Sequence, residues 1–211
     1  MKNLLIIGAR GFGREVYNTA LESIGYGEEY TVKGFLDDKS DALDGYEDYP
    51  PIIGPVENYI IEKNDVFICA LGDVHYKKKY ADIILSKGGE FINLIHNKAF
   101  ISKNVKIGKG CIFCIHSSVS CDVTMGDFVT FQSFSVAGHD VTIGNYVQIN
   151  AHSFMGGFVQ LGDMTTLHTG AIVHPHVRIE TGAIVGAGSV AIRKVKADTT
   201  VFGIPARKLE L

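Results

Sequence analysis

The chain has 211 residues, of which 46% are hydrophobic, and its formal net charge is −3. This composition is typical of a globular protein and excludes a disordered segment. Lys and Arg are scattered along the chain, so we expect neither a nucleic-acid partner nor an anionic membrane surface. The apolar run 4–7 is too short for a signal peptide or a spanning helix, and we therefore expect a cytoplasmic protein.

Residues 1–94 predict a small α/β unit in which apolar strands alternate with amphipathic helices. A loop rich in Asp, Pro and Gly precedes the third strand. The alternation favours a Rossmann-like half-domain with a parallel sheet. The expected strands are 4–7, 31–36 and 66–71, and the expected helices are 12–24 and 75–87.

A glycine loop joins the first strand to the first helix. Gly8, Gly11 and Gly13 have the spacing G-x-x-G-x-G, whereas the dinucleotide fingerprint is G-x-G-x-x-G, which disfavours a nicotinamide site. Bare amides at a helix N-terminus can bind phosphate oxygens. Asp37 and Asp38 end the second strand, where carboxylates accept hydrogen bonds from ribose hydroxyls or a base. Alternatively, the glycines only allow tight packing and the aspartates are solvated turn residues.

A six-residue repeat runs from Ile95 to Lys196 and predicts a left-handed parallel β-helix of between five and six coils. Every sixth residue from Ile95 to Ala191 is apolar, and four residues after each comes a small or β-branched residue. These two registers point the same way in an extended segment, so three sides close a triangular prism around a common interior. A period of six fits neither an α-helix nor a simple amphipathic strand.

Glycine and aromatic residues complete the repeat. Glycine often follows the aliphatic residue, and we expect it to turn corners with unusual dihedral angles; these positions are 108, 126, 138, 144, 156, 162 and 186. Aromatic residues are expected on the outer faces, where a cyclic homotrimer would bury them. They are Phe128, Phe134, Tyr146, Phe154 and Phe158.

His139 and Asp140 form the only histidine–acid pair within the repeat, and both lie off its two interior registers. A neutral imidazole can accept a proton near pH 7, and a neighbouring carboxylate orients it, so the pair suits a general base. Gly156 and Gly157, one strand spacing away, leave a backbone amide to stabilise an oxyanion. Alternatively, His139 is a surface corner residue.

A metal site is not expected. Cys111 and Cys114 have C-x-x-C spacing, but no second pair follows and Cys111 occupies an interior register, so we expect reduced, structural thiols. The β-helix scaffold also occurs in zinc carbonic anhydrases. However, His116 and His152 lie two coils apart, roughly 9.6 Å, whereas two zinc ligands must both lie about 2 Å from one ion.

Five segments carry a resemblance to a known family over nearly the whole chain: IIGARGFGREV, FLDD, SVAGHDVTIGNYV, GAIVGAGSVAIRKV and GIPARKL. They resemble bacterial sugar acetyltransferases of the β-helix superfamily, typified by sialic acid O-acetyltransferases and UDP-4-amino-sugar N-acetyltransferases. The resemblance implies acetyl-CoA as cosubstrate and a trimer with active sites between subunits. It also implies a nucleotide-sugar-binding domain at 1–94, a catalytic β-helix at 95–196 and a CoA-contacting tail at 197–211.

The resemblance further assigns site residues. The catalytic residues are His139 and Asp140. The acetyl-CoA-binding residues are Gly157, His168, Gly186, Ala187, Gly188, Gly203, Pro205 and Arg207. The nucleotide-sugar-binding residues are Gly8, Arg10, Gly11, Phe12, Gly13, Asp37, Asp38 and Gly72. Departures from the family pattern are Phe12 and His168, where histidine and glycine are common, and Gln132 and Gln148, which replace an asparagine and a histidine.

The predicted activity is transfer of an acetyl group from acetyl-CoA to the amine of a UDP-linked amino sugar. We expect direct transfer in a ternary complex with His139 as base, and no acyl-enzyme on cysteine. Two alternatives remain: an O-acetyltransferase acting on a sialic acid or another hydroxyl, and a non-catalytic nucleotide-sugar or interaction protein that keeps the prism as a scaffold.

Overall fold

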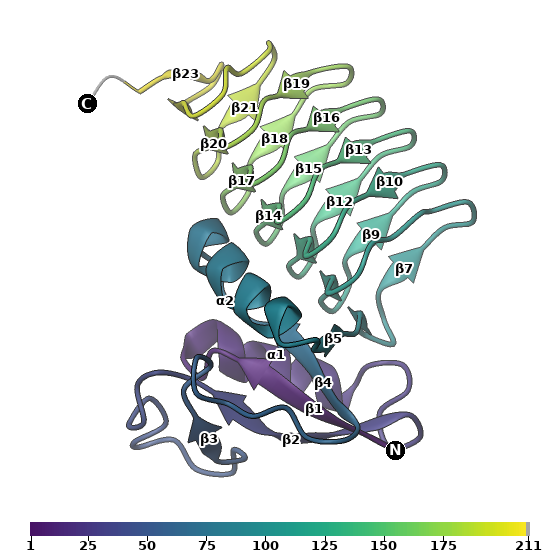
Figure 1. The fold of residues 1–211 in the computed structure, drawn as a ribbon. Helices are drawn as coiled ribbons and strands as arrows, with labels where there is room; N and C mark the ends of the chain where they lie inside the picture. Colours follow the sequence, from purple (N-terminus) through teal and green to yellow (C-terminus); the bar gives the residue numbers. More distant parts are fainter. Residues whose placement is uncertain (210–211) are drawn as a thin grey trace. The chain divides into compact units, whose positions relative to one another are not determined.

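A computed structural model describes residues 1–209 and divides the chain into two compact units, the first spanning Met1–Asn97 and the second beginning at Lys98 (Figure 1). The last two residues of the tail expected at 197–211 lie outside the described residues. Among residues 1–209, no helix combines the length and the apolar character that crossing a bilayer requires.

The first unit is built on a parallel sheet with strand order β3-β2-β1-β4-β5. Its strands are β1 (Lys2–Ile7), β2 (Tyr30–Leu36), β3 (Ile52–Gly54), β4 (Asp65–Cys69), β5 (Glu90–Phe91) and β6 (Leu94–Ile95), and its helices are α1 (Gly11–Leu21) and α2 (Val74–Ser86). The Rossmann-like class is confirmed. Strands β3 and β5 were not predicted, because two or three residues are too few for an apolar pattern to show.

The core of this unit is the central strand. Residues 4–7 of β1 are fully buried or nearly so, and every residue of β4 is buried. Helix α1 ends at Leu21, earlier than the expected 24, because the following turn contains Gly25 and Gly27 with positive φ. Helix α2 begins after Asp73, whose carboxylate accepts from the amides of His75 and Tyr76.

The second unit is the predicted left-handed parallel β-helix, whose short strands stack as rungs (Figure 1). Within residues 98–209 they form three sheets. The first contains β10 (Thr124–Met125), β13 (Thr142–Ile143), β16 (Gln160–Leu161) and β19 (Arg178–Ile179). The second contains β7 (Phe100–Ile101), β9 (Ser118–Val119), β12 (Val136–Ala137), β15 (Phe154–Met155), β18 (Ile172–Val173) and β21 (Val190–Ala191). The third contains β8 (Ile112–Phe113), β11 (Thr130–Phe131), β14 (Gln148–Ile149), β17 (Thr166–Leu167), β20 (Ile184–Val185), β22 (Thr200–Phe202) and the antiparallel β23 (Arg207–Lys208).

The register between coils is eighteen residues. For example, Val136 pairs with Ser118 on one side and with Phe154 on the other. From Cys111 to Val195, both predicted interior registers are buried without exception. The hydroxyl groups buried there are satisfied locally, as where Ser135 Oγ donates to the carbonyl of Gln132. The prism interior is therefore packed with hydrocarbon and paired polar groups.

The corner glycines do not have the role predicted for them. Residues with φ near +60° lie three positions after the aliphatic residue, not one, and most are not glycine. At the predicted positions, glycine is instead required by space: a Cβ on Gly144 would lie 2.4 Å from Asp163 Oδ1 and 2.6 Å from its amide nitrogen. The glycines therefore let successive coils approach each other closely. The non-glycine residues with positive φ in the β-helix are Asn104, His116, Asp122, Phe128, Phe134, Asp140, Tyr146, His152, Phe158, Met164, His176 and Asp198.

The prediction that all five aromatic residues lie exposed on flat outer faces is wrong. Phe128 is buried, and Phe128, Phe134, Tyr146 and Phe158 occupy corners. Only Phe154 belongs to a strand, β15. Corner rings stack in columns: Phe128 on Tyr146 with centroids 4.9 Å apart, and Phe158 on His176 at 4.8 Å. This stacking offsets the strain of a left-handed backbone at bulky residues.

Substitution of Gly144 tests the close-approach role. We expect Gly144→Ala to lower the free energy of unfolding by about 1–3 kcal/mol, because the new methyl group overlaps Asp163. Gly170→Asn is the control, since Gly170 has φ of +70°, a Cβ there would come no nearer than 3.8 Å to another atom, and asparagine tolerates that conformation. Thermal unfolding of both variants should show a clear loss for Gly144→Ala only. Equal melting temperatures would contradict the packing argument.

Candidate functional site

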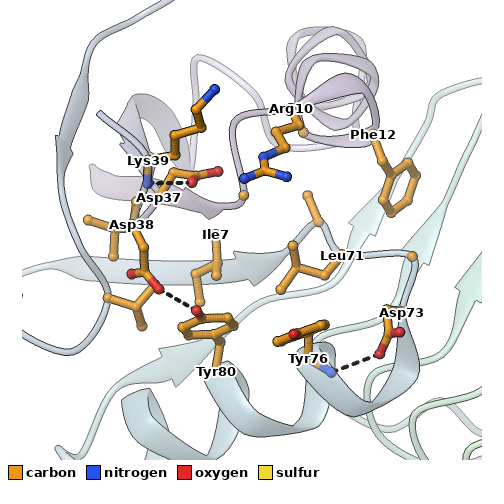
Figure 2. Close-up of a pocket in the computed structure, with 16 residues that line it drawn as sticks. Ile7, Arg10, Phe12, Asp37, Asp38, Lys39, Leu71, Asp73, Tyr76 and Tyr80 are labelled. Atoms are coloured by element: carbon orange, nitrogen blue, oxygen red, sulfur yellow. Dashed lines mark hydrogen bonds between the residues drawn. The ribbon is translucent and has the colours of Figure 1, made fainter. Parts of the chain in front are cut away.

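A pocket of about 590 Å³ opens in the first unit at the carboxyl ends of β1, β2 and β4. Ligands of open parallel sheets bind at this edge. Figure 2 shows Arg10 and Lys39 on one side, and Tyr76 and Tyr80 of α2 on the other. The pocket is lined by Gly8, Arg10, Phe12, Gly13, Asp37, Asp38 and Gly72, which were predicted to bind a nucleotide sugar, and further by Ile7, Leu36, Lys39, Val56, Ala70, Leu71, Asp73, Tyr76 and Tyr80.

The three loop glycines divide between the two roles considered from the sequence. Gly8 has φ of +97°, a conformation that favours glycine. A Cβ on Gly13 would lie 2.0 Å from the carbonyl oxygen of Gly8, so Gly13 permits the packing of α1 on β1. A Cβ on Gly11 would meet nothing within 4 Å. Gly8 and Gly13 are therefore needed by the fold, whereas Gly11 leaves open space at the helix start.

The start of α1 is suited to an anion. Arg10 is the N-cap residue, and no side chain caps the first turn. The first amides of a helix have no intrahelical acceptor and carry partial positive charge. Figure 2 shows the Arg10 guanidinium beside this loop, above Leu71. The loop can thus supply both backbone donors and a cation to a phosphate group.

The two aspartates differ in their partners. Asp37 Oδ2 accepts from the amide of Ala9 at 2.8 Å, and its Oδ1 accepts from the amide of Lys39 at 2.9 Å. Asp37 therefore ties the glycine loop to the end of β2. Asp38 instead accepts from the hydroxyl of Tyr80, and this hydrogen bond, together with burial, raises the pKa of Tyr80 to about 12. The tyrosine hydroxyl remains protonated and can orient the Asp38 carboxylate.

Sequence reasoning missed the two tyrosines of the pocket wall. Tyr76 and Tyr80 lie four residues apart on α2, and their rings are nearly parallel with centroids 6.5 Å apart. Their spacing after the capping Asp73 was the available signal, because residues i and i+4 share a helix face. The wall offers aromatic surface on which a planar ligand can pack.

The second unit holds the His139–Asp140 pair at a corner after β12. The His139 Nδ1 lies 2.8 Å from Asp140 Oδ2, and both side chains are about half exposed. Donation from Nδ1 to the carboxylate leaves the Nε2 lone pair free to accept a proton. The ring also meets Phe158 edge-on at 5.2 Å. The geometry therefore provides an oriented imidazole that solvent and ligands can reach.

Gly157 lies directly under this imidazole. A Cβ on Gly157 would be 2.7 Å from His139 Nε2, so only glycine fits there. Among residues 1–209, the amide of Gly157 donates to no protein acceptor. The amide of Gly156 is not available, because it donates to the carbonyl of Val173 in the next coil. Of the two glycines expected to offer a backbone amide to an oxyanion, only Gly157 does so. One free N–H therefore lies beside the histidine.

The residues predicted to bind acetyl-CoA fall into two places. Gly157 lies at the His139 corner. The others lie around the last coils: His168 precedes Gly186 by one coil, and the Gly203 amide donates to Ser189 Oγ. Gly186 is required by packing, because a Cβ there would lie 2.3 Å from the ring of Phe202. The remaining predicted positions, exposed near this end, are Ala187, Gly188, Pro205 and Arg207.

Two departures from the family pattern are joined by hydrogen bonds. The side-chain amide of the buried Gln148 donates to Asn150 Oδ1 at 2.8 Å, and Asn150 Nδ2 lies 3.3 Å from His168 Nδ1. Gln132 Oε1 accepts from the amide of Ala151 at 3.2 Å. Gln148 belongs to β14 of the third sheet, and Gln132, Asn150 and His168 each directly follow a strand of that sheet.

Neither the cysteines nor the histidines form a metal cluster in the part of the chain that the structure describes. Cys69, Cys111 and Cys114 are buried, and Cys121 is exposed. Burial raises the pKa of the Cys69 thiol to about 12. His116 and His152 are separated by the ring of Phe134, which stacks on His152 and is tilted against His116, with centroids 5.1 Å away from each.

Comparison with known proteins agrees with these features. The family model described as the PglD N-terminal domain matches residues 3–84. The acetyltransferase domain of PglB from Neisseria gonorrhoeae shares 26% identity and a TM-score of 0.88, covering 99% of this chain and 100% of that one. PerB from Caulobacter crescentus, solved with CoA and GDP-perosamine, shares 26% identity and a TM-score of 0.89, covering 100% and 98%.

Curated relatives match in sequence over shorter spans. The UDP-N-acetylbacillosamine N-acetyltransferase of Bacillus subtilis is 29% identical over 116 residues, covering 53% of this chain and 51% of that protein. An uncharacterised protein of Acanthamoeba polyphaga mimivirus is 30% identical over 123 residues, covering 58% and 23%. The matches thus span about half or less of these relatives. Together with the structural likeness, they confirm the resemblance to sugar acetyltransferases.

Two glycine substitutions test how the first unit forms its glycine loop. We expect Gly13→Ala to lower the free energy of unfolding by about 1–3 kcal/mol, because the methyl group would overlap the Gly8 carbonyl. Gly11→Ala should melt at or above the wild-type temperature, since its side chain meets open space and alanine favours the helix. Differential scanning calorimetry compares the two, and a harmless Gly13→Ala would refute the packing role.

Proposed function

We propose that this protein is an acetyl-CoA-dependent N-acetyltransferase acting on the amine of a nucleotide-linked amino sugar. The observation that carries the proposal is the imidazole of His139, held by Asp140 above the free amide of Gly157. The structural relatives support the class, since PerB was solved with CoA and GDP-perosamine, and a curated relative is an N-acetyltransferase of a UDP-linked sugar.

The proposed reaction is direct transfer. The sugar amine attacks the thioester carbonyl, a C–N bond forms, and the C–S bond breaks as CoA leaves. His139 Nε2 takes the proton lost by the amine and returns a proton to the departing sulfur, so that CoA leaves as a thiol. The Gly157 amide donates to the carbonyl oxygen as negative charge develops on it. No covalent enzyme intermediate is required, and the buried cysteines have no part in the reaction.

Asp140 has two functions in this mechanism. Its carboxylate accepts from Nδ1 and so presents Nε2 in the basic tautomer. It also stabilises the imidazolium that forms when the proton is taken. Because both side chains are about half exposed, solvent screens this ion pair, and its main effect is orientation of the ring.

The nucleotide is proposed to bind in the pocket of the first unit. Arg10 and the first turn of α1 supply donors for the diphosphate, and Gly11 leaves space for the phosphate to approach. Asp38, oriented by Tyr80, is left to accept from a base or ribose. The expected acceptor of the acetyl group is a UDP-linked amino sugar.

The active unit is proposed to be a homotrimer with the catalytic pair between subunits. His139 is half exposed and lies beside Phe158, and the side chains of Phe134, Phe154 and Phe158 in the same unit are between 43% and 49% exposed, which leaves aromatic surface for a second copy to bury. A second copy that covers this surface would exclude water from the thioester. No metal is included in the proposal, and the cytoplasm is the expected compartment.

Replacement of the base is the direct test. We expect His139→Ala to lower kcat/KM by about 10²- to 10⁴-fold, because proton transfer to a positioned side chain contributes this much. The dissociation constant of CoA, measured by calorimetry, should change little. His75→Ala, an exposed histidine outside the proposed site, is the control and should retain wild-type kcat/KM. Wild-type activity in His139→Ala would refute the base assignment.

A panel of acceptors tests the substrate class. Thiol release from acetyl-CoA should occur with nucleotide-linked amino sugars and should be absent with sialic acid or other hydroxyl acceptors. The amine is expected to be the acceptor because it is the better nucleophile once its proton is removed. Turnover of hydroxyl acceptors alone would show an O-acetyltransferase, and absence of CoA binding would show a non-catalytic scaffold.

A further inference from the structure

The first corner of the β-helix, which follows the sheet β10-β13-β16-β19, carries a ladder of side-chain caps. At each step a side chain accepts from the backbone amide eighteen residues earlier. Asp127 Oδ1 accepts from Lys109 at 2.9 Å, Asn145 Oδ1 from Asp127 at 2.9 Å, and Asp163 Oδ1 from Asn145 at 2.7 Å. Three successive outward amides of this corner, those of Lys109, Asp127 and Asn145, are therefore occupied by side chains of the next coil.

The second corner follows the sheet β7-β9-β12-β15-β18-β21. It has the same backbone hydrogen bonding as the first corner, but no side chain caps the amide of Gly157. The carbonyl of Gly157 accepts from His176 at 3.0 Å, just as the carbonyl of Asn145 accepts from Met164 at 2.8 Å. The residue equivalent to Asp163 is Pro175, one coil after Gly157. Proline has no side-chain acceptor, and the amide of Gly157 consequently stays free of protein partners in residues 1–209.

We propose that Pro175 is a positioning residue, which keeps the Gly157 amide available to the acyl carbonyl by withholding the cap that Asp or Asn provides at the first corner. This inference rests on the proposed function and assigns a further residue to the same site. Pro175 does not touch the reacting atoms in this scheme. It acts through Gly157, whose single N–H can serve either a cap or a substrate oxygen with full strength.

Local packing supports this assignment. The Pro175 ring packs against Gly156, where a Cβ would lie 2.6 Å from Pro175 Cδ. Proline also fixes its own φ and removes a second donor from the corner. The sequence Gly156-Gly157 with Pro175 one coil later thus leaves the Gly157 N–H uncapped beside His139, where the first corner has three capped amides in a row.

The experiment installs the missing cap. Pro175→Asn should place a carboxamide oxygen on the Gly157 amide, because the corners share their backbone hydrogen bonding. We expect kcat to fall by about 10²-fold or more, the effect of removing one oxyanion donor. KM for acetyl-CoA should change less than about threefold. Hydrogen exchange of the Gly157 amide, followed by NMR, should slow in the variant, and its melting temperature should equal or exceed that of the wild type.

Two control variants distinguish the effect of the added cap from the effect of losing the proline ring and from a general loss of stability. Pro175→Ala removes the ring without adding an acceptor, so its kcat should stay within about threefold of wild type. Asp163→Ala uncaps the equivalent amide at the first corner and should lower the melting temperature while leaving kcat unchanged. Because Pro175→Ala and Pro175→Asn both lose the ring and only Pro175→Asn adds an acceptor, a shared loss of activity in the two would overturn the inference in favour of a stiffening role.

The remaining outcomes are also decisive. Slowed exchange at Gly157 with wild-type kcat would overturn the role of the free amide, while the activity itself would stand on thiol release and on His139→Ala. If neither Pro175→Asn nor Pro175→Asp protects the Gly157 amide, residue 175 does not control that amide and the inference is wrong. Loss of thiol release in the wild type would instead refute the proposed function.

Discussion

The second unit depends on one constraint, the backbone pairing of each coil with the coils eighteen residues before and after it. This pairing satisfies the strand amides and carbonyls from β7 to β22 and places chemically unrelated side chains in fixed columns. Two buried registers fill the prism. The outward positions of each six-residue repeat are free to vary. The neighbour of an outward side chain in the next coil is the residue eighteen positions later, and His139 therefore lies over Gly157.

One backbone geometry consequently supports different corner chemistry. At the first corner, Asp and Asn side chains cap amides of the preceding coil, which stabilises the turn. At the second, a histidine, a glycine and a proline occupy the equivalent places, and an amide is left bare. The second corner therefore lacks a cap on the Gly157 amide. The capping side chains lie in the column of the first corner, and the proposed reactive groups lie in the column of the second. Because both columns point outward, the solenoid can carry a polar site without opening its core.

The sequence predicted the β-helix and the His139–Gly157 proximity because both follow from a period, which a chain displays without any knowledge of tertiary contacts. It misplaced the positive-φ residues, since Phe and Tyr at those corners are stabilised by ring stacking between coils, which no local propensity reports. It missed Tyr80 and its bond to Asp38 for a similar reason: residues 42 positions apart meet only after α2 packs on the sheet. The short strands β3 and β5 were too brief to show any pattern.

The pocket of the first unit has one wall whose shape is set by the backbone and a second wall formed by side chains. Both oxygens of Asp37 accept from backbone amides, so this residue shapes the loop, and Gly8 and Gly13 are set by backbone geometry and contact. These features position phosphate donors irrespective of the base. The opposite wall consists of side chains only, Asp38 with Tyr80 and Tyr76 beside it (Figure 2). PerB and the Bacillus subtilis relative are named for different nucleotides, GDP and UDP. Since a side-chain wall can change without moving the loop, the proposed nucleotide site would select the base through Asp38 and the two tyrosines and would hold the diphosphate at the start of α1.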